Sequence, residues 1–136
     1  MDTDKLIHKE LSYKIRGICI DTYKYLGYGF REKTYEKAIR EKLKNVNMLF
    51  KEQLYAPIRV EKMRLSSQYL DFLIEDKIIL EIKVGVYIKQ IYFDQVEEYL
   101  KNNKKDLGIL ALFSSSGVKF SRVLNHDNIK SNSIVS

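Results

Sequence analysis

The stretch LDFLIEDKIILEIKV, residues 70–84, consists of two apolar segments that flank a polar turn, and three charged residues stand inside those segments. Asp71, Glu81 and Lys83 form the pattern D-x9-E-x-K, in which the Glu-x-Lys pair shares one face of a strand. Two carboxylates can hold Mg²⁺, a hard cation that prefers oxygen ligands. A metal held in this way polarises a phosphate and lowers the pKa of a bound water, and a neighbouring lysine stabilises the developing charge. The pattern therefore suits metal-assisted hydrolysis of a phosphodiester.

The same stretch reads as two strands joined by a polar turn at residues 75–77. If this turn is a three-residue hairpin loop, the register places Asp71 directly opposite Glu81, with the two Cβ atoms roughly 5 Å apart. Two carboxylates at that distance repel each other, so a positive group is expected between them: Lys83, a divalent metal, or both. Taken alone, the pattern also fits a surface hairpin with an ordinary Glu–Lys pair.

Three further features favour the functional interpretation. The strand around Glu81 is apolar on its other face, which is typical of a central strand, where a charged pair is costly unless it is paired or coordinated. Glu32 and Glu36 lie four residues apart on one face of an expected helix. Either could supply a third acidic ligand, and both could equally be solvated charges that pair with nearby basic residues. Gln95 and Tyr99 are also four residues apart, on a later helix.

These residues depend on a predicted order of two helices, three strands, a third helix and two more strands. We expect the helices over residues 4–26, 31–45 and 87–103, and the strands over residues 50–60, the two arms of the 70–84 hairpin, 106–114 and 118–124. Thr3 or Asp4 could cap the first helix, and Pro57 indicates an edge strand or a bulge. The polar tail after His126 is expected to fray. This order predicts an α/β (α+β) fold with a mixed central sheet flanked by helices.

The whole chain has 136 residues, a length that suits one compact domain spanning residues 1–136. Its net charge of +6 and pI of about 9.3 favour a polyanionic partner such as nucleic acid. The one cysteine, Cys19, allows no internal disulfide and fits a reducing compartment. No apolar run approaches the length of a membrane span, and the polar start does not resemble a signal peptide. We therefore expect a soluble cytoplasmic protein with no membrane association.

The segment GFREKTY, residues 29–35, matches the pattern G-x-x-E-x-x-Y. In this respect the chain resembles the GxxExxY proteins, a group within the PD-(D/E)XK nuclease superfamily, which has the restriction-endonuclease-like fold. The resemblance covers roughly residues 15–124, because TYEKAI, LDFLIEDKIILEIK and DQVEEYL follow in the expected order and approximate spacing. It implies a restriction-endonuclease-like core and a nuclease that leaves a 5′-phosphate and a 3′-hydroxyl.

Carried over residue by residue, the resemblance implies that Asp71 and Glu81 bind a Mg²⁺ or Mn²⁺ ion and that Lys83 assists the attacking water. Glu36 resembles the first-helix acid that helps to hold the metal in related nucleases. Glu32, one turn earlier, is the signature glutamate and a second candidate for that role. Because the core residues are all present, the resemblance implies an intact catalytic centre.

Gln95 and Tyr99 resemble the Q-x-x-x-Y motif of RecB-type nucleases, which lies near the active site and the nucleic acid; the alternative is helix packing with one polar tip. A basic cluster at the end of that helix could contact phosphates or be a solvated helix terminus. It consists of Lys101, Lys104 and Lys105. Two positions depart from the family pattern: Leu70 stands where the superfamily nominally has proline, and Tyr92 stands near the place of a frequent histidine.

The leading hypothesis is a Mg²⁺- or Mn²⁺-dependent nuclease that acts on DNA, with a homodimer as a compatible arrangement. A second hypothesis is a non-catalytic nucleic-acid-binding domain, or a subunit of a DNA-processing assembly, with the same charge and fold. A third is an interaction domain that binds no nucleic acid. Divalent-metal binding at Asp71 and Glu81 separates the first hypothesis from the second, and salt-dependent DNA binding separates both from the third.

Overall fold

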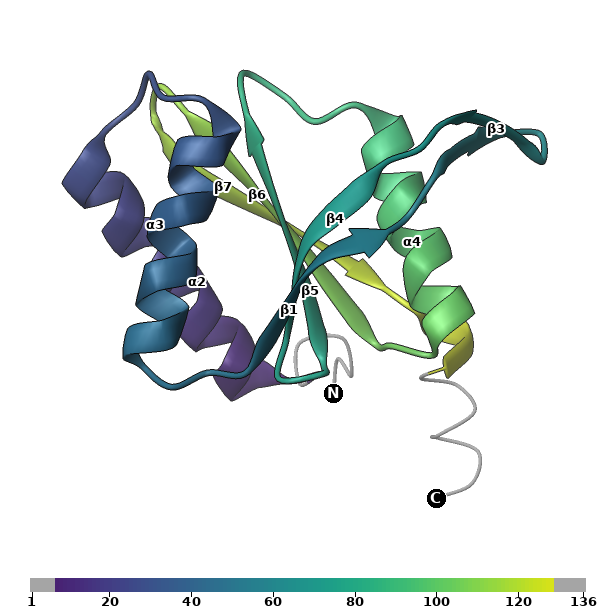
Figure 1. Cartoon of the computed structure of the whole chain (residues 1–136), viewed down its shortest axis with the longest axis horizontal. Helices are drawn as coiled ribbons and strands as arrows, with labels where there is room; N and C mark the ends of the chain where they lie inside the picture. Colours follow the sequence, from purple (N-terminus) through teal and green to yellow (C-terminus); the bar gives the residue numbers. More distant parts are fainter. Residues whose placement is uncertain (1–6, 129–136) are drawn as a thin grey trace.

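A five-stranded mixed sheet forms the centre of the molecule, with strand order β1-β4-β5-β6-β7. The computed structural model describes residues 7–128. The helices are α2 (Lys9–Leu26), α3 (Glu32–Asn45) and α4 (Gln90–Asn103). The strands are β1 (Phe50–Tyr55), β2 (Ile58–Val60), β3 (Met63–Ser66), β4 (Tyr69–Ile74), β5 (Ile78–Val84), β6 (Leu107–Ser114) and β7 (Gly117–Leu124). The predicted α/β class is confirmed, and the sheet is flanked by helices on both faces (Figure 1).

Helices α2 and α3 cover one face of the sheet because each has an apolar stripe at helical spacing. Their buried side chains, among them Ile15, Ile39 and Leu43, pack with Phe72 and Leu80 from the sheet. A hydrogen bond fixes the connection between the two helices, since the Tyr35 hydroxyl donates to the carbonyl of Gly27 at 2.6 Å. Gly27 has a φ of 77°, the left-handed region that glycine tolerates best. The start of α3, and with it Glu32 and Glu36, is thereby held against the sheet.

Helix α4 covers the opposite face and connects two parallel neighbours, β5 and β6. Strand β6 is buried along its whole length, as its apolar sequence predicts. The helix lies close to the sheet at Gly108, where a built Cβ atom would lie 2.5 Å from Cγ1 of Val96. The missing side chain at this position allows α4 to lie directly on the strand.

Strands β4 and β5 separate in the middle of the sheet. Their paired residues run from Ile74–Ile78 to Phe72–Leu80, which is the register predicted from the hairpin, and the pairing ends there. The neighbouring β1–β4 ladder lacks the pair that Asp71 would make with Gln53, a residue with a φ of 56°. Beyond this point β4 and β5 diverge like the arms of a V (Figure 1). Asp71 is therefore located where the sheet opens.

The strand expected over residues 50–60 is two strands, β1 and β2, in different sheets. It breaks at Ala56 and Pro57, after which β2 pairs with β3 in a separate two-stranded sheet. Proline has no N–H for a ladder, so β1 cannot continue through it. Strand β3 was not predicted, because its apolar residues, Met63 and Leu65, are exposed instead of facing a core. The β2–β3 hairpin, which we call the arm, projects from the body beyond α4 (Figure 1).

Three predicted ends also differ. Helix α4 begins at Gln90 instead of residue 87, because Gly85, with a φ of 143°, is followed by an irregular segment. Helix α2 begins at Lys9, and the proposed caps Thr3 and Asp4 lie outside the described residues. Residues 126–128 are helical where fraying was expected, and the remainder of that tail is outside the described residues. No helix within residues 7–128 is long and apolar enough to cross a membrane.

Candidate active site

Two carboxylates occupy the point at which β4 and β5 diverge. Asp71 is 9% exposed and Glu81 is 3% exposed. The Asp71 backbone N–H donates to Oε1 of Glu81 at 3.1 Å, and the Ile82 N–H donates to Oδ2 of Asp71 at 2.7 Å. Each side chain thus accepts a backbone hydrogen bond from the opposite strand, in place of a regular ladder bond. The structure brings Asp71 and Glu81 together, in the register that the hairpin pattern predicts.

Helix α3 adds a third carboxyl group, because Glu36 and Asp71 share a side-chain hydrogen bond. This bond, burial and the charge of Asp71 raise the pKa of Glu36 to about 8. Burial raises the pKa of Asp71 to about 8, the charge of Glu81 adds to the increase, and the bond from Glu36 opposes it. Since the shared bond raises the pKa of Glu36 and lowers that of Asp71, Glu36 is the donor in this bond and Asp71 the acceptor.

Glu32, the other candidate from this helix, lies farther from the centre of the cluster. Its negative charge contributes to the raised pKa of Glu81, after burial as the main cause. Hydrogen bonds from Asp71 and the positive charge of Lys83 oppose that increase. Glu36, one turn later on α3, is the residue that contacts Asp71. The geometry therefore favours Glu36 over Glu32 as the helical partner of the two strand carboxylates.

Lys83 is held between a carboxylate and an aromatic ring. Its Nζ atom lies 3.8 Å from Oε2 of Glu81 and 3.7 Å from the ring centroid of Tyr92, on α4. A cation above an aromatic face is attracted by the electron density of the ring. These two contacts hold the ammonium group beside the carboxylates, in a side chain that is 18% exposed. The sequence did not predict this contact between Tyr92 and Lys83. Its one signal was that Tyr92 stands near the place of a frequent histidine in the family pattern.

Gln95 connects α4 to the base of the arm. Its Nε2 atom donates to the carbonyl of Ala56 at 2.7 Å, and the side chain is 4% exposed. Its Oε1 atom is buried and has no hydrogen-bond partner among the described residues. An unpaired buried acceptor costs free energy. Gln95 therefore has both a structural bond and a spare acceptor, and within residues 7–128 no hydrogen bond joins it to the carboxylates.

The structure does not bring Tyr99 and the predicted basic cluster to the carboxylates. Burial raises the pKa of Tyr99, Lys105 opposes the increase, and the charge of Asp76 adds to it. Asp76 belongs to the β4–β5 turn, five residues and about 16 Å of strand from Asp71. Lys105 forms an ion pair with Asp76 at 2.9 Å. The other two lysines of that cluster, also at the far end of α4, are Lys101 and Lys104.

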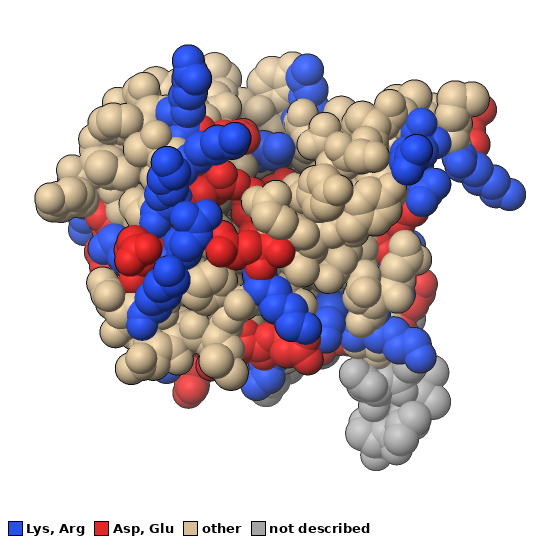
Figure 2. Space-filling view, in the orientation of Figure 1, with Lys and Arg blue, Asp and Glu red and all other residues tan. Residues whose placement is uncertain are grey.

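A different basic surface borders the carboxylates. Four basic residues of α3 recur at helical spacing along one face: Lys33, Lys37, Arg40 and Lys44. We call these four residues the α3 stripe. Arg40 pairs with Glu52 of β1 at 2.7 Å, and the lysines are exposed. Figure 2 shows a band of Lys and Arg side chains on this side of the molecule, with acidic side chains along its inner edge. The spacing of the stripe is visible in the sequence, which by itself indicates only partners for the helix glutamates.

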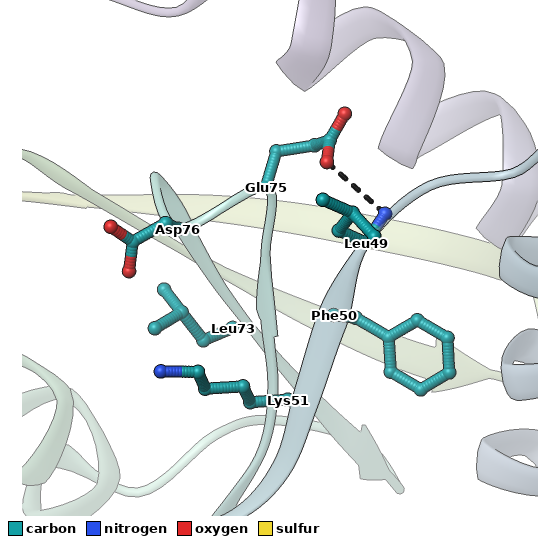
Figure 3. Close-up of a pocket in the computed structure, with 6 residues that line it drawn as sticks. All are labelled: Leu49, Phe50, Lys51, Leu73, Glu75 and Asp76. Atoms are coloured by element: carbon teal, nitrogen blue, oxygen red, sulfur yellow. Dashed lines mark hydrogen bonds between the residues drawn. The ribbon is translucent and has the colours of Figure 1, made fainter.

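A hollow of about 420 Å³ lies elsewhere, at the edge between β1 and the β4–β5 turn (Figure 3). Its lining includes Phe50, Leu73 and Glu75. The Glu75 carboxylate accepts a hydrogen bond from the Leu49 N–H at 3.1 Å, so it secures the start of β1. Neither carboxylate of the lining, Glu75 or Asp76, is buried, and we assign no chemistry to the hollow.

The donor set at the strand divergence fits a divalent cation. Within residues 7–128 no three carboxylate, imidazole or thiolate groups are spaced as a ready-made metal site. Glu36, Asp71 and Glu81 nevertheless offer only oxygen ligands, which hard cations prefer, and Asp71 is close enough to the other two to shift the pKa of each. A cation would remove the repulsion that the proton on Glu36 now relieves. Loss of that proton is therefore a condition for binding.

A mixed sheet that opens over two carboxylates and a lysine, beside a helix that adds a third acid, is the arrangement of the restriction-endonuclease-like fold. A family model described as the PD-(D/E)XK nuclease superfamily matches residues 9–123. The chain therefore belongs to this superfamily of nucleases.

Comparisons with individual proteins are more distant. No curated protein matches the chain. The solved structure of SSO0001 aligns with a TM-score of 0.49 at 19% identity, over 73% of this chain and 55% of that one. An alkaline exonuclease from Laribacter hongkongensis aligns with a TM-score of 0.44 at 11% identity, over 68% of this chain and 55% of that one. The chain thus corresponds to about half the length of either solved protein.

Proposed function

We propose that this protein is a divalent-metal-dependent nuclease that hydrolyses phosphodiester bonds in DNA. The observation that carries the proposal is the group formed by Asp71, Glu81 and Lys83 at the strand divergence, with Glu36 bonded to it from α3. Membership of the nuclease superfamily supports the reaction class. The net charge of +6 and the α3 stripe support a polyanionic substrate.

Asp71, Glu81 and Glu36 would hold a Mg²⁺ or Mn²⁺ ion, with Glu32 one turn away as a further acidic group. A bound ion of this kind polarises the phosphate and lowers the pKa of a water ligand. The chain's own contributions follow from its geometry. Glu36 releases its proton as the pH approaches 8. Lys83, fixed by Glu81 and the ring of Tyr92, orients the attacking water and stabilises the charge that develops on the phosphate oxygens.

The lysines of the α3 stripe would bind the phosphate backbone on either side of the scissile bond. Such contacts are independent of sequence and weaken with salt. We also propose that the protein belongs to the GxxExxY group, because the three marked residues of G-x-x-E-x-x-Y are present. The tyrosine of the pattern, Tyr35, donates the hydrogen bond that fixes the α2–α3 connection. The glutamate of the pattern, Glu32, lies close enough to affect the charge of Glu81.

A cleavage assay tests the proposal. Purified protein is incubated with labelled linear, nicked, branched and single-stranded DNA and with RNA, in Mg²⁺ or Mn²⁺ and in EDTA. We expect cleavage that requires the metal and falls below detection in Asp71→Asn and Lys83→Ala. The matched controls are Glu97→Gln and Lys119→Ala, which make equivalent changes, acid to amide and lysine to alanine, at exposed positions outside the cluster. Cleavage that persists in EDTA, or in both site variants, would contradict the proposal.

One observation favours a second candidate, a nucleic-acid-binding domain or assembly subunit that does not cut. The carboxylates already satisfy one another through a shared proton and backbone N–H groups, and no ready-made metal site is present within the described residues. This candidate predicts salt-dependent DNA binding without cleavage, and no change in binding when Mg²⁺ is added. The same assay, combined with a binding titration, separates the two functions.

A further inference from the structure

Two exposed tyrosine rings lie side by side next to the strand divergence. Tyr55 of β1 and Tyr69 of β4 are directly paired across the strands, with ring centroids 5.7 Å apart and an interplanar angle of 64°. They are 47% and 49% exposed, and neither belongs to a core cluster. Large aromatic rings at adjacent strand positions normally pack beneath a covering element. Here the rings have no such cover among the described residues.

The position of the rings relates them to the candidate active site. Their chain neighbours Leu54 and Leu70 pack in the core on the α4 side, so strand alternation places both rings on the opposite face. Helix α3, which contributes Glu36, covers that same face farther along the sheet. Tyr69 precedes Asp71 by two residues, a distance of about 7 Å along β4.

Positive charge surrounds the ring pair on the side of the arm. Nη1 of Arg64, on β3, donates to the Tyr55 hydroxyl at 3.1 Å, which fixes one ring against the base of the arm. Arg59 and Lys62 are exposed on the same hairpin, and Arg59 also pairs with Glu98 at 3.1 Å. The ring pair with its basic neighbours therefore lies two residues along β4 from Asp71, on the face of the sheet that α3 covers farther along.

We propose that Tyr55 and Tyr69 form a base-stacking platform for an unpaired nucleic-acid strand that enters the site. This inference rests on the proposed function and specifies its substrate. Aromatic side chains bind single strands because every base has a face that can stack, whereas the bases of a duplex have their faces covered by their neighbours. The α3 stripe and the basic residues of the arm bind the phosphates of the same strand. The duplex beyond a frayed or branched end contributes backbone contacts only.

Equilibrium binding provides the test. Fluorescence anisotropy is measured with a labelled oligonucleotide, single-stranded or annealed to its complement, in EDTA so that binding is separated from cleavage. We expect the single strand to bind at least tenfold more tightly than the duplex. Tyr69→Thr, which keeps a strand-forming residue but removes the ring, weakens single-strand binding about tenfold. Tyr69→Phe, which keeps the ring, binds as the wild type does.

Two controls distinguish stacking from a general effect. Tyr13→Thr removes a ring that is 77% exposed on α2, away from the site, and leaves both affinities unchanged. Circular dichroism of each variant checks the fold, and if Tyr69→Thr is unfolded, Tyr55→Thr is measured in its place. Equal affinity for single strand and duplex, tighter duplex binding, or no binding overturns the inference. So does a change in oligomeric state on removal of the ring without a change in affinity, because that result assigns the rings to a second copy of the chain.

The inference and the proposed function can fail separately. If the protein cleaves DNA but the ring variants bind normally, the nuclease proposal stands and the stacking platform is wrong. If no metal-dependent cleavage occurs but single-strand binding depends on the rings, the platform stands and the nuclease proposal is wrong.

Discussion

Replacing Asp71 by asparagine should make the protein more stable at alkaline pH while it abolishes cleavage. In the native protein burial, and the charge of Glu81, hold the pKa of Asp71 near 8, compared with 3.8 in the unfolded chain. Between these values the native state holds a proton, shared with Glu36, that the unfolded chain has released. The free energy of unfolding must therefore fall as the pH rises from about 4 to about 8, and level off above that range.

The size of this fall follows from the interval between the two pKa values. If the native state retains one proton between pH 3.8 and about 8, the free energy of unfolding falls by at most about 5–6 kcal/mol over this range. Each pH unit contributes about 1.4 kcal/mol. Water reaches the Glu36 side of the pair and screens the repulsion, so we expect roughly half of that limit, about 2–3 kcal/mol. Asparagine keeps an acceptor for the Ile82 N–H, and its neutral amide removes the charge that repels Glu36 and Glu81. The variant should therefore gain about 2 kcal/mol over the wild type at pH 8.

Urea denaturation is followed by circular dichroism in EDTA, at four pH values from 5 to 8. It measures how the free energy of unfolding changes with pH in the wild type and in Asp71→Asn. Glu97→Gln serves as the control, because it makes an equivalent change on the exposed face of α4 and should keep the wild-type slope. A wild-type free energy of unfolding that stays constant or rises from pH 5 to pH 8 would refute the shared proton. An Asp71→Asn slope equal to that of the wild type would refute the assignment of the proton to this pair.

Three other predictions concern the metal, the lysine and the packing of α4. Mg²⁺ or Mn²⁺ should raise the melting temperature more at pH 8 than at pH 5.5, because protons compete for the carboxylates; equal shifts in a thermal melt would contradict carboxylate ligands. Tyr92→Leu should lower the cleavage rate about tenfold with little change in KM, whereas Tyr92→Phe keeps the cation–π contact and the rate; equal rates in steady-state assays would exclude the contact from catalysis. Gly108→Ala should lower the free energy of unfolding by about 1–3 kcal/mol, because its Cβ atom would overlap Val96. Gly17→Ala, with open space around it in α2, should not lower the free energy of unfolding. If urea titrations show no loss of stability in Gly108→Ala, α4 can shift away from β6.

The hairpin that contains Asp71 and Glu81 could be predicted from the sequence because its register depends on local geometry. A short turn and strict alternation leave one arrangement of the two strands, and the apolar face of β5 identifies it as central. Glu36 could be named as a candidate from its spacing with Glu32. The choice between the two required the position of α3 against the sheet, which depends on packing over the whole core.

Tyr99 and the arm show where local sequence patterns no longer predict the position of a residue. Helical spacing correctly predicts that Gln95 and Tyr99 share a face of α4, but one turn moves Tyr99 about 6 Å along the axis. The direction of α4 against the sheet then takes Tyr99 toward Asp76, at the end opposite to the carboxylates. The arm was missed for a related reason. Its exposed apolar residues carry no core-facing period, so only the break at Pro57 was visible in the sequence.

The hydrogen bond from Ile82 to Asp71 joins a buried backbone amide to a side chain that titrates. Strand β5 is paired with β6 along its length, so its amides should be among the slowest to exchange with deuterated solvent. The Ile82 N–H, in a residue that is 1% exposed, bonds to the titrating carboxylate of Asp71 instead of to a backbone carbonyl of β4. Its proton resonance should therefore move with the ionisation of Asp71 while its neighbours stay fixed. A single backbone amide in the most protected part of the sheet would then act as a spectroscopic reporter of the charge at the site.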